Sequence, residues 1–428
     1  MYGGDGLSRI DSGDGKRKTV FVPLVLPGEK VEATIAEERP GFARARLDRV
    51  VVAAPERTSP PCPYFGECGG CHYQHATYES QLRLKTQILH ETVARISKLE
   101  LPEITAHASP PLGYRNRTRM KLRTAPEFSI GYYRLGSHNF LPVQECPISS
   151  PAINRVLQTI WSVARTQKFP TELQEIEFFA NHEDTAVLLE FVVSKDDNSK
   201  LLALAKAIQK EAAEVAGIGV IVRKSATDEP VAAPELSDTV PQASKTLTGE
   251  TSFKYSVDSY EYRIGVDAFF QTNRFLIGKL VDLATAGISG KLAMDLYAGA
   301  GLFTLPLSKG FDRVVAVESS PASVQYLRQN APPHAKIVEA TTEAYVGRGG
   351  QKPGYIVVDP PRAGLGKRVV AGIVRLAPRT LTYVSCDPST LARDLPGLVN
   401  AGYKITQAHL VDLFPQTFHI ETVLRLER

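Results

Sequence analysis

One pattern repeats through the C-terminal part of the sequence: a short apolar run ends at a glycine or proline turn, and a helical segment follows. Examples are "KLAMDLYAGAGLFTLPL", "RVVAVESSPASVQYL", "YIVVDPPRAGLGKRVV" and "TYVSCDPSTLARDL". Strands that alternate with helices in this way are typical of a parallel α/β sheet. We therefore expect a doubly wound α/β domain over residues 251–428.

The rest of the chain predicts further domains, because 428 residues are too many for one hydrophobic core. Residues 1–55 contain brief apolar strands between Pro-Gly and Gly turns, which is typical of a small β-barrel or of another small β domain. Residues 56–250 are expected to form a central α+β domain. Apolar spacing predicts a helix near residues 78–98, which could pack with the C-terminal domain, and residues 224–249 have the composition of a surface linker.

Composition narrows the setting of the protein. The N-terminus lacks the apolar segment of a signal peptide, and no run of eighteen apolar residues occurs, so we expect a cytoplasmic protein without a membrane partner. No obligate protein partner is evident. The five cysteines include three in "CPYFGECGGC". In a reducing compartment such spacing indicates metal ligands or a catalytic thiol more often than a disulfide.

A net charge of +4 does not by itself indicate a polyanionic partner, but one segment is strongly basic. The stretch "YRNRTRMKLR" has a cation at every second position. On a strand these side chains would share one face at a spacing of about 7 Å, which suits a nucleic-acid backbone. A solvated sheet face is the alternative. The residues are Arg115, Arg117, Arg119, Lys121 and Arg123.

The segment "DLYAGAG" ends an apolar strand and opens a helix, so backbone amides can approach a ligand there. It differs from the dinucleotide motif G-x-G-x-x-G, because Thr304 stands where the third glycine would be. It fits the turn of enzymes that bind S-adenosylmethionine (SAM). Gly299 and Gly301 allow close backbone approach, and Glu318 at the end of the next strand could accept hydrogen bonds from ribose hydroxyls.

Two further strand ends carry reactive groups. Asp359 precedes two prolines, which fix its carboxylate at a strand tip, although a structural turn would also explain it. Cys386 leaves another strand and precedes the capping residues Asp387 and Ser389. A helix N-terminus stabilises a thiolate, so we expect a nucleophile with a lowered pKa; a small buried cysteine is the alternative.

Five ordered motifs, "DAFFQTN", "DLYAGAGLFTLPL", "VDPPR", "SCDPSTLARDL" and "LFPQTFHIETV", resemble those of the RNA (uracil-5-)-methyltransferases. The segments "YGGDGLSRID" and "GFARARL" are similar to the TRAM domain of that family, an OB-like barrel. The resemblance runs over essentially the whole chain. It implies a TRAM-like barrel, a central domain with an iron–sulfur cluster and a Rossmann-like class I SAM methyltransferase domain.

The resemblance also implies the chemistry. The poorly nucleophilic C5 of uracil is activated when a thiolate adds to C6, and a base must later remove the C5 proton. By match to the family motifs, Cys386 is the nucleophile and Glu421 the proton acceptor. Gln271, Tyr297, Glu318 and Asp359 match positions that bind SAM. We expect the target nucleotide to be flipped into the pocket.

With Cys386 assigned, four cysteines remain, and four soft ligands suit either zinc or a 4Fe–4S cluster. Ribosomal-RNA members with this cysteine pattern carry a 4Fe–4S cluster, so the resemblance implies one here, together with a uridine of 23S rRNA as the substrate. The alternatives are the same reaction on transfer RNA or at two ribosomal sites, and a catalytically silent RNA-binding or chaperone protein. The cluster ligands are Cys62, Cys68, Cys71 and Cys146.

Overall fold

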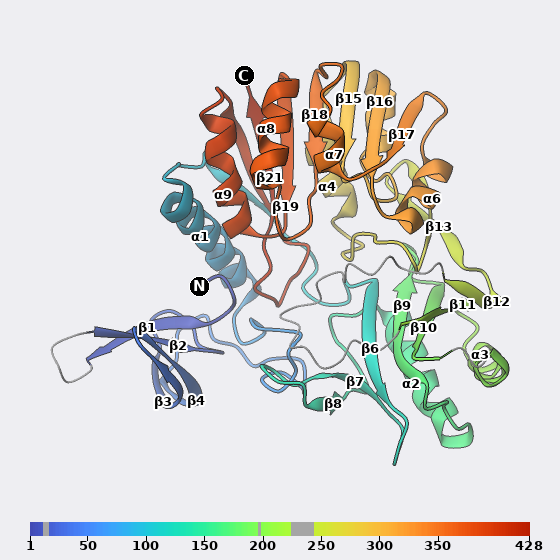
Figure 1. Cartoon of the computed structure of the whole chain (residues 1–428). Coiled ribbons are helices and arrows are strands. Elements are labelled where there is room, and N and C mark those ends of the chain that lie inside the picture. Colours follow the sequence, from blue (N-terminus) through green and yellow to red (C-terminus); the bar gives the residue numbers. More distant parts are fainter. Residues whose placement is uncertain (12–16, 196–197, 224–243) are drawn as a thin grey trace.

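A computed structural model describes residues 1–11, 17–195, 198–223 and 244–428. Figure 1 shows three main parts: a small N-terminal sheet, a central sheet with two helices, and a large α/β sheet above both. Most of the linker predicted over residues 224–249 lies outside the described residues. In the described part of the chain, no helix is long and apolar enough to cross a membrane.

The N-terminal sheet has the strand order β1-β2-β4-β3. Its strands are β1 (Gly6–Asp11), β2 (Arg17–Val22), β3 (Lys30–Arg39) and β4 (Phe42–Val52). The core is small and consists of Val20, Val22, Ala43 and Ala45. Among the described residues β1 and β3 are unpaired edges, so the predicted barrel is here an open four-stranded sheet.

The central part is a seven-stranded sheet in the order β12-β11-β10-β9-β6-β7-β8. Two helices cover it, and the first begins at a clear signal, since the Ser150 side chain accepts a hydrogen bond from the Ile153 amide and Pro151 follows. The elements are β6 (Arg117–Arg123), β7 (Ser129–Tyr133), β8 (Phe140–Pro142), α2 (Pro151–Thr166), β9 (Leu173–Ala180), β10 (Val187–Val193), α3 (Asn198–Glu211), β11 (Val215–Val222) and β12 (Lys245–Gly249).

The C-terminal part is an eight-stranded sheet in the order β17-β16-β15-β18-β19-β21-β20-β5, in which only β21 runs antiparallel. A hairpin of β13 (Ser252–Val257) and β14 (Tyr260–Gly265) precedes it. The strands are β15 (Gly290–Leu296), β16 (Phe311–Glu318), β17 (Ala335–Glu339), β18 (Tyr355–Val358), β19 (Thr380–Ser385), β20 (Lys404–Val411) and β21 (Glu421–Glu427). The helices are α4 (Ile277–Thr285), α5 (Thr304–Gly310), α6 (Pro321–Asn330), α7 (Thr342–Gly347), α8 (Gly366–Leu376) and α9 (Pro388–Val399).

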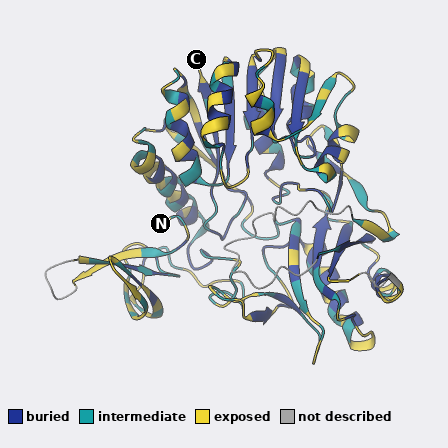
Figure 2. Cartoon of the chain, viewed as in Figure 1, coloured by how far each residue is buried: buried dark blue, intermediate teal, exposed yellow. Residues whose placement is uncertain are grey.

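The inner strands of this sheet are buried on both faces, as Figure 2 shows, which explains their nearly continuous apolar sequences. Met294 belongs to the core on one face of β15, and its neighbour Ala293 to the core on the other. Strand β15 pairs with β16 on one side and with β18 on the other. The chain passes from β15 to β16 and β17 before it returns to β18. Ligands of doubly wound sheets bind at the carboxyl ends of strands around such a switch point.

Part of the segment assigned to the central domain lies with the C-terminal part. The predicted helix is present as α1 (Tyr78–Ser97), and it packs on α9, the contact with the C-terminal domain that the sequence allowed, with Leu89 and Val93 fully buried in that core. The following strand β5 (Ile104–His107) pairs with β20 and forms the edge of the large sheet. Residues 78–107 therefore belong structurally to the C-terminal part, although they lie far from it in the sequence.

Candidate active site

Three strand ends of the large sheet bring the predicted reactive residues together. Cys386 follows β19, and Glu421 begins the antiparallel neighbour β21. Because Ser385 pairs with Thr422, the next residues along, Cys386 and Glu421, lie beside each other across the two strands. Asp359 follows β18, and β18 pairs with β19 on the side opposite to β21. The site therefore collects a thiol and two carboxyl groups at one edge.

Asp359 lies at the centre of this group. Its Oδ2 accepts a hydrogen bond of 3.4 Å from the Gln271 amide, and its own backbone N–H donates to the Leu296 carbonyl at 3.4 Å. Burial raises the pKa of Asp359 to about 7, the nearby Asp295 charge adds to the rise, and the bond from Gln271 opposes it. At neutral pH this carboxyl therefore stands close to its titration point.

Glu421 is almost fully buried, and its Oε1 has no hydrogen-bond partner. Burial raises the pKa of Glu421 well above its ordinary value, and the charge of Asp359 raises it further while Arg362 lowers it. A buried carboxyl with a free oxygen is costly unless another group completes its hydrogen bonding. This oxygen is thus a candidate to face a bound substrate.

The predicted lowering of the Cys386 pKa is wrong for this ligand-free protein. Burial raises the pKa of Cys386 to about 12, and the charges of Glu421 and Asp359 add to the effect. The helix N-terminus does not compensate, because the Asp387 carboxylate accepts the Ser389 and Thr390 amides at 2.8 and 3.1 Å. The positive end of α9 therefore faces a carboxylate rather than the thiol.

The glycine turn after β15 has the open geometry that a cofactor needs. Gly299 and Gly301 have φ angles of 55° and 96°, and a Cβ on Gly299 would meet nothing within 4 Å. Tyr297 also has a positive φ of 66°, which is costly for a residue with a side chain and concentrates at functional sites. Glu318 holds the turn, since its Oε2 accepts the Gly299 amide at 2.8 Å.

Two further site residues lie inside the quoted motifs but were not assigned a role from sequence. Asp295 is buried, bonds to the Thr304 hydroxyl at 2.6 Å and leaves Oδ1 without a partner; burial raises its pKa to about 7. Arg362 lowers the pKa values of both Cys386 and Glu421. Asp295 lies in "DLYAGAG" and Arg362 in "VDPPR", so these motifs are the sequence signals that could have identified the two residues.

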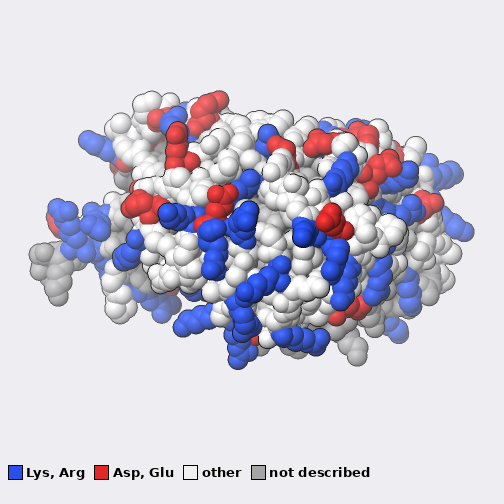
Figure 3. Space-filling view, turned by 90° about the horizontal axis from the view of Figure 1, so that it is seen from above, with Lys and Arg blue, Asp and Glu red and all other residues white. Residues whose placement is uncertain are grey.

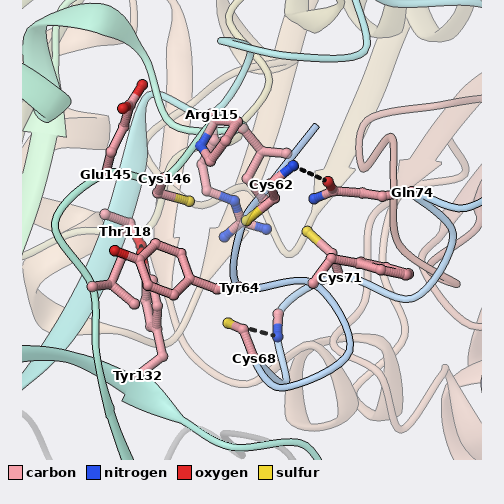
Figure 4. Close-up of a pocket in the computed structure, with 15 residues that line it drawn as sticks. Cys62, Tyr64, Cys68, Cys71, Gln74, Arg115, Thr118, Tyr132, Glu145 and Cys146 are labelled. Atoms are coloured by element: carbon pink, nitrogen blue, oxygen red, sulfur yellow. Dashed lines mark hydrogen bonds between the residues drawn. The ribbon is translucent and has the colours of Figure 1, made fainter. Parts of the chain in front are cut away.

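The four remaining cysteines line one cavity of about 100 Å³. Figure 4 shows them around a common space, with the Arg115 side chain reaching in among them. Burial raises the pKa of Cys68 to about 11 and that of Cys71 to about 12. The four thiols thus line a common cavity, although in the described residues no three His, Cys, Asp or Glu side chains are placed to bind one metal ion together.

The structure corrects the prediction of a basic row that is free to bind phosphates. Glutamates on the adjacent strand β9 pair with it: Arg117 and Arg119 contact Glu177, and Lys121 contacts Glu175. The alternation on one strand face was right, but the paired carboxylates lie more than fifty residues away in the sequence. Two glutamates thus pair with three of the five cations, and the side chains of Arg119 and Lys121 remain 37% exposed.

The ends of the basic row also differ from the prediction. Arg115 precedes β6 and enters the cysteine cavity, where its Nε is buried without a partner. The Arg117 guanidinium donates to the backbone carbonyls of Val266 and Ala268, next to Gln271. Arg123 is exposed and lies 4.8 Å from the Phe140 ring centre. Arg119 is exposed as well, so these two side chains match the expected solvent-facing position.

Cations are nevertheless plentiful on the surface. Figure 3 shows many Lys and Arg side chains over one face of the molecule, with Asp and Glu mixed among them.

Comparisons with known proteins identify the family of the chain. The profile of a family described as tRNA (Uracil-5-)-methyltransferase matches residues 77–339 and 351–428. An uncharacterized RNA methyltransferase of Aquifex aeolicus is 32% identical over 100% of this chain and 96% of its own length. The 23S rRNA (uracil(1939)-C(5))-methyltransferase RlmD of Salmonella choleraesuis is 31% identical over 96% of this chain and 91% of its own length.

Among solved structures, the Pyrococcus abyssi tRNA (uracil-54, C5)-methyltransferase in complex with S-adenosyl-L-homocysteine has the same fold. The TM-score is 0.75 at 24% identity, and the match covers 99% of this chain and 100% of the other. The predicted family is thereby confirmed: the chain belongs to the tRNA (uracil-5-)-methyltransferase family and is an RNA uracil-C5 methyltransferase that uses SAM.

Proposed function

We propose that the protein converts a uridine of 23S rRNA to 5-methyluridine, with Cys386 as the nucleophile and Glu421 as the base. The observation that carries this proposal is the pairing of β19 with β21, which sets the thiol beside the carboxyl group. These are the two groups that the reaction requires in contact with one base. The target base is held out of its stack to reach them.

The Cys386 thiol first loses its proton to solvent, and the thiolate adds to C6 of uracil. C5 thereby becomes an enolate carbon that takes the methyl group, and S-adenosylhomocysteine leaves. Glu421 then accepts the C5 proton, and the returning electrons expel the thiolate from C6. When bound, SAM supplies the methyl group together with a sulfonium cation. Asp359 and Glu421 would favour their ionised forms if that cation were bound beside them, and an ionised Glu421 could accept the C5 proton.

The residues around the glycine turn fit this cofactor. Gly299 leaves open space, and Glu318 accepts three backbone amides, two on Oε1 and one on Oε2, so Oε2 can still accept from a ribose hydroxyl. Tyr297 adjoins the turn, and Gln271 and Asp359 close the site on the substrate side. We assign SAM binding to Gln271, Tyr297, Glu318 and Asp359, with Gly299 and Gly301 providing backbone approach.

The cysteine cavity is proposed to hold a 4Fe–4S cluster on Cys62, Cys68, Cys71 and Cys146. The cavity of about 100 Å³ exceeds the about 10–15 Å³ that one water-sized sphere needs. The buried, unpartnered Nε of Arg115 also requires an anionic or acceptor group, which a cluster with four thiolates provides. The cluster would act as a structural element, since methyl transfer moves no net electrons.

The choice of 23S rRNA is supported by the likeness to the Salmonella RlmD protein over nearly the whole chain. We further propose that residues 1–55 act as a TRAM-like RNA-binding part and that the central sheet holds flanking RNA, through phosphates and stacked bases. Mapping of 5-methyluridine in a deletion strain tests the target. Loss of a transfer-RNA methyl group with intact ribosomal RNA would favour the alternative substrate.

The mechanism is tested by two substitutions. Glu421→Gln is expected to accumulate a protein–RNA adduct that survives denaturing electrophoresis, because the C5 proton has no acceptor, whereas Cys386→Ala forms no adduct and no product. Glu427→Gln, at the exposed end of the same strand, is the matched control and should retain activity. Methyl transfer by Cys386→Ala would refute the mechanism.

A further inference from the structure

Tyr2 brings the N-terminal part of the chain into contact with the proposed nucleophile. Its hydroxyl lies 3.1 Å from Asp387 Oδ2 and 3.3 Å from the Cys386 carbonyl oxygen, across a separation of 384 residues from Cys386. Asp387 uses its other oxygen to cap α9. The hydroxyl therefore donates to the short segment that fixes where the Cys386 side chain begins.

The ring of Tyr2 contacts the second loop of the site. It packs edge-on against Phe418, with ring centres 5.6 Å apart. Phe418 belongs to residues 412–420, which connect β20 to Glu421. A single side chain thus touches both segments that carry the proposed nucleophile and base.

The local backbone holds Tyr2 in this place. The Gly4 amide donates to the Met1 carbonyl at 3.2 Å, so Tyr2 lies at the second position of a tight turn. Gly3 follows with a φ of 105°, the region that favours glycine at the third position of such a turn. Gly4 is buried, and a Cβ there would lie 3.2 Å from the His72 side chain. The segment is therefore closely fitted against the cysteine-bearing loop.

We propose that Tyr2 is a positioning residue for methyl transfer: its hydroxyl fixes the Cys386–Asp387 segment, and its ring fixes the loop that leads to Glu421. The inference rests on the proposed function of these two residues. Three residues separate Tyr2 from β1, so the N-terminal sheet is directly connected to the catalytic loops. Residues 1–55 then contribute to the chemical step as well as to RNA binding.

Tyr2→Phe removes the hydroxyl and keeps the ring. The rate of adduct formation, measured on denaturing gels in the Glu421→Gln background, is expected to fall about ten-fold, which corresponds to about 1.4 kcal/mol. RNA affinity and the unfolding temperature should stay at the values of the parent protein. Tyr260→Phe is the matched control, since it also loses a hydroxyl while keeping its ring 4.0 Å from Lys309 Nζ.

A double-mutant cycle tests whether the hydroxyl acts through Asp387. Asp387→Ser still caps α9, but its single oxygen is used by the helix amides and leaves none for Tyr2. In that background, Tyr2→Phe should change the adduct rate by clearly less than ten-fold, because only the Cys386 carbonyl remains to accept from the hydroxyl. A full ten-fold effect there, or an unchanged rate in the single Tyr2→Phe variant, would overturn the inference. Methylation by Cys386→Ala would instead overturn the proposed function, so the two failures can be told apart.

Discussion

At the scale of single residues, burial opposes ionisation of the Cys386 thiol and of the buried carboxyl groups beside it. Burial and neighbouring carboxylates raise the pKa of Cys386 to about 12, and burial raises the pKa values of Asp295 and Asp359 to about 7. At neutral pH the thiol therefore keeps its proton, whereas Asp295 and Asp359 are close to their titration points. Such a site becomes reactive when a cation enters it, because an adjacent positive charge favours thiolate and carboxylate forms.

The raised pKa of Cys386 predicts how its thiol reacts when neither SAM nor RNA is added. Below its pKa the thiolate fraction rises ten-fold for each pH unit, so alkylation of Cys386 by iodoacetamide should keep rising between about pH 7 and pH 10. Peptide-level mass spectrometry separates Cys386 from the other cysteines. At a fixed pH, SAM should raise the rate above that with S-adenosylhomocysteine, which lacks the sulfonium charge. A plateau near pH 9, as for an ordinary thiol, would contradict the expectation.

The strand-end positions of three proposed site residues could be predicted because strand ends and glycine turns have recognisable sequence patterns, whereas Glu421 was proposed only from the family resemblance. Cys386, Asp359 and Glu318 each follow an apolar run and precede a turn or helix. The pKa of Cys386 could not be predicted in this way. It depends on which carboxylates the sheet places around the thiol and on the use of the α9 amides by Asp387.

At the scale of elements, β6 and the residue before it, Asn116, support the loop before α4 that carries Gln271. Asn116 donates from its backbone to the Thr272 carbonyl at 3.0 Å and from its side chain to Tyr255 Oη at 2.6 Å. Arg117 adds its bonds to the carbonyls of Val266 and Ala268. The basic strand thus connects the central sheet to the loop that carries Gln271.

Arg117→Met is therefore expected to act on the cofactor site and on stability. The unfolding free energy should fall by about 3 kcal/mol, the low end for a broken buried pair, because Arg119 still contacts Glu177. SAM should bind several-fold more weakly, as measured by calorimetry, since the Gln271 loop loses two anchors. The salt dependence of RNA binding should keep its slope, because this cation does not reach phosphates.

Arg123→Met is the control for this prediction, since Arg123 is exposed on the same strand. It should leave the unfolding free energy and SAM affinity nearly unchanged. A flattened salt slope in Arg117→Met with unaltered SAM binding would restore the phosphate-binding interpretation.

The alternation of charges along residues 115–123 correctly predicted a strand with its cations on one face, because a strand repeats every two residues. The residues of the neighbouring strand that contact these cations could not be predicted. Glu175 and Glu177 reach Lys121 and Arg119 only after β9 pairs with β6, which is a long-range contact. The partner of a strand is set by the whole sheet, so local pattern leaves it open.

At the scale of the whole molecule, distant segments meet under the loop 412–420. Lys85 of α1 and Asp412 form a fully buried ion pair of 2.6 Å, and Lys85 also donates to the Phe414 carbonyl. Gln81 of α1 exchanges hydrogen bonds with Gln416 at 2.9 and 3.0 Å. Helix α1 therefore holds the segment leading to Glu421, which explains why it belongs to the C-terminal part despite its place in the sequence.

The three-part organisation could be predicted because each part has its own sequence pattern, but apart from the packing of α1 the contacts between parts could not. The joining of β5 to the sheet edge and the reach of Tyr2 to Asp387 depend on the assembled fold. Neither residue type nor spacing near these segments indicates such a contact. For β5 and for Tyr2, the local sequence pattern predicts the local structure but not the contacts with distant segments.

The loop that carries Cys62, Cys68 and Cys71 contacts the same segment, residues 412–420. Directly after Cys71, the backbone amides of His72 and Tyr73 both donate to the Gln416 carbonyl, at 2.8 and 2.9 Å. Gln416 has a positive φ of 69°, so its conformation depends on the groups that hold it. A cluster bound to Cys71 would fix this contact and, through it, the loop that ends at Glu421.

Loss of the cluster should therefore loosen a segment that binds no metal. The intact protein, purified without oxygen, is expected to contain about four iron and four sulfide per chain. In Cys68→Ser, which lacks one ligand, amide hydrogen exchange over residues 412–420 should accelerate more than exchange in β15, whose bonds lie within the sheet. Adduct formation should slow in parallel. Cys386→Ser is the control, because it should retain iron and normal exchange. Stoichiometric zinc in the intact protein would refute the iron cluster, and unchanged exchange in an iron-depleted Cys68→Ser protein would show that the Gln416 contact is held without it.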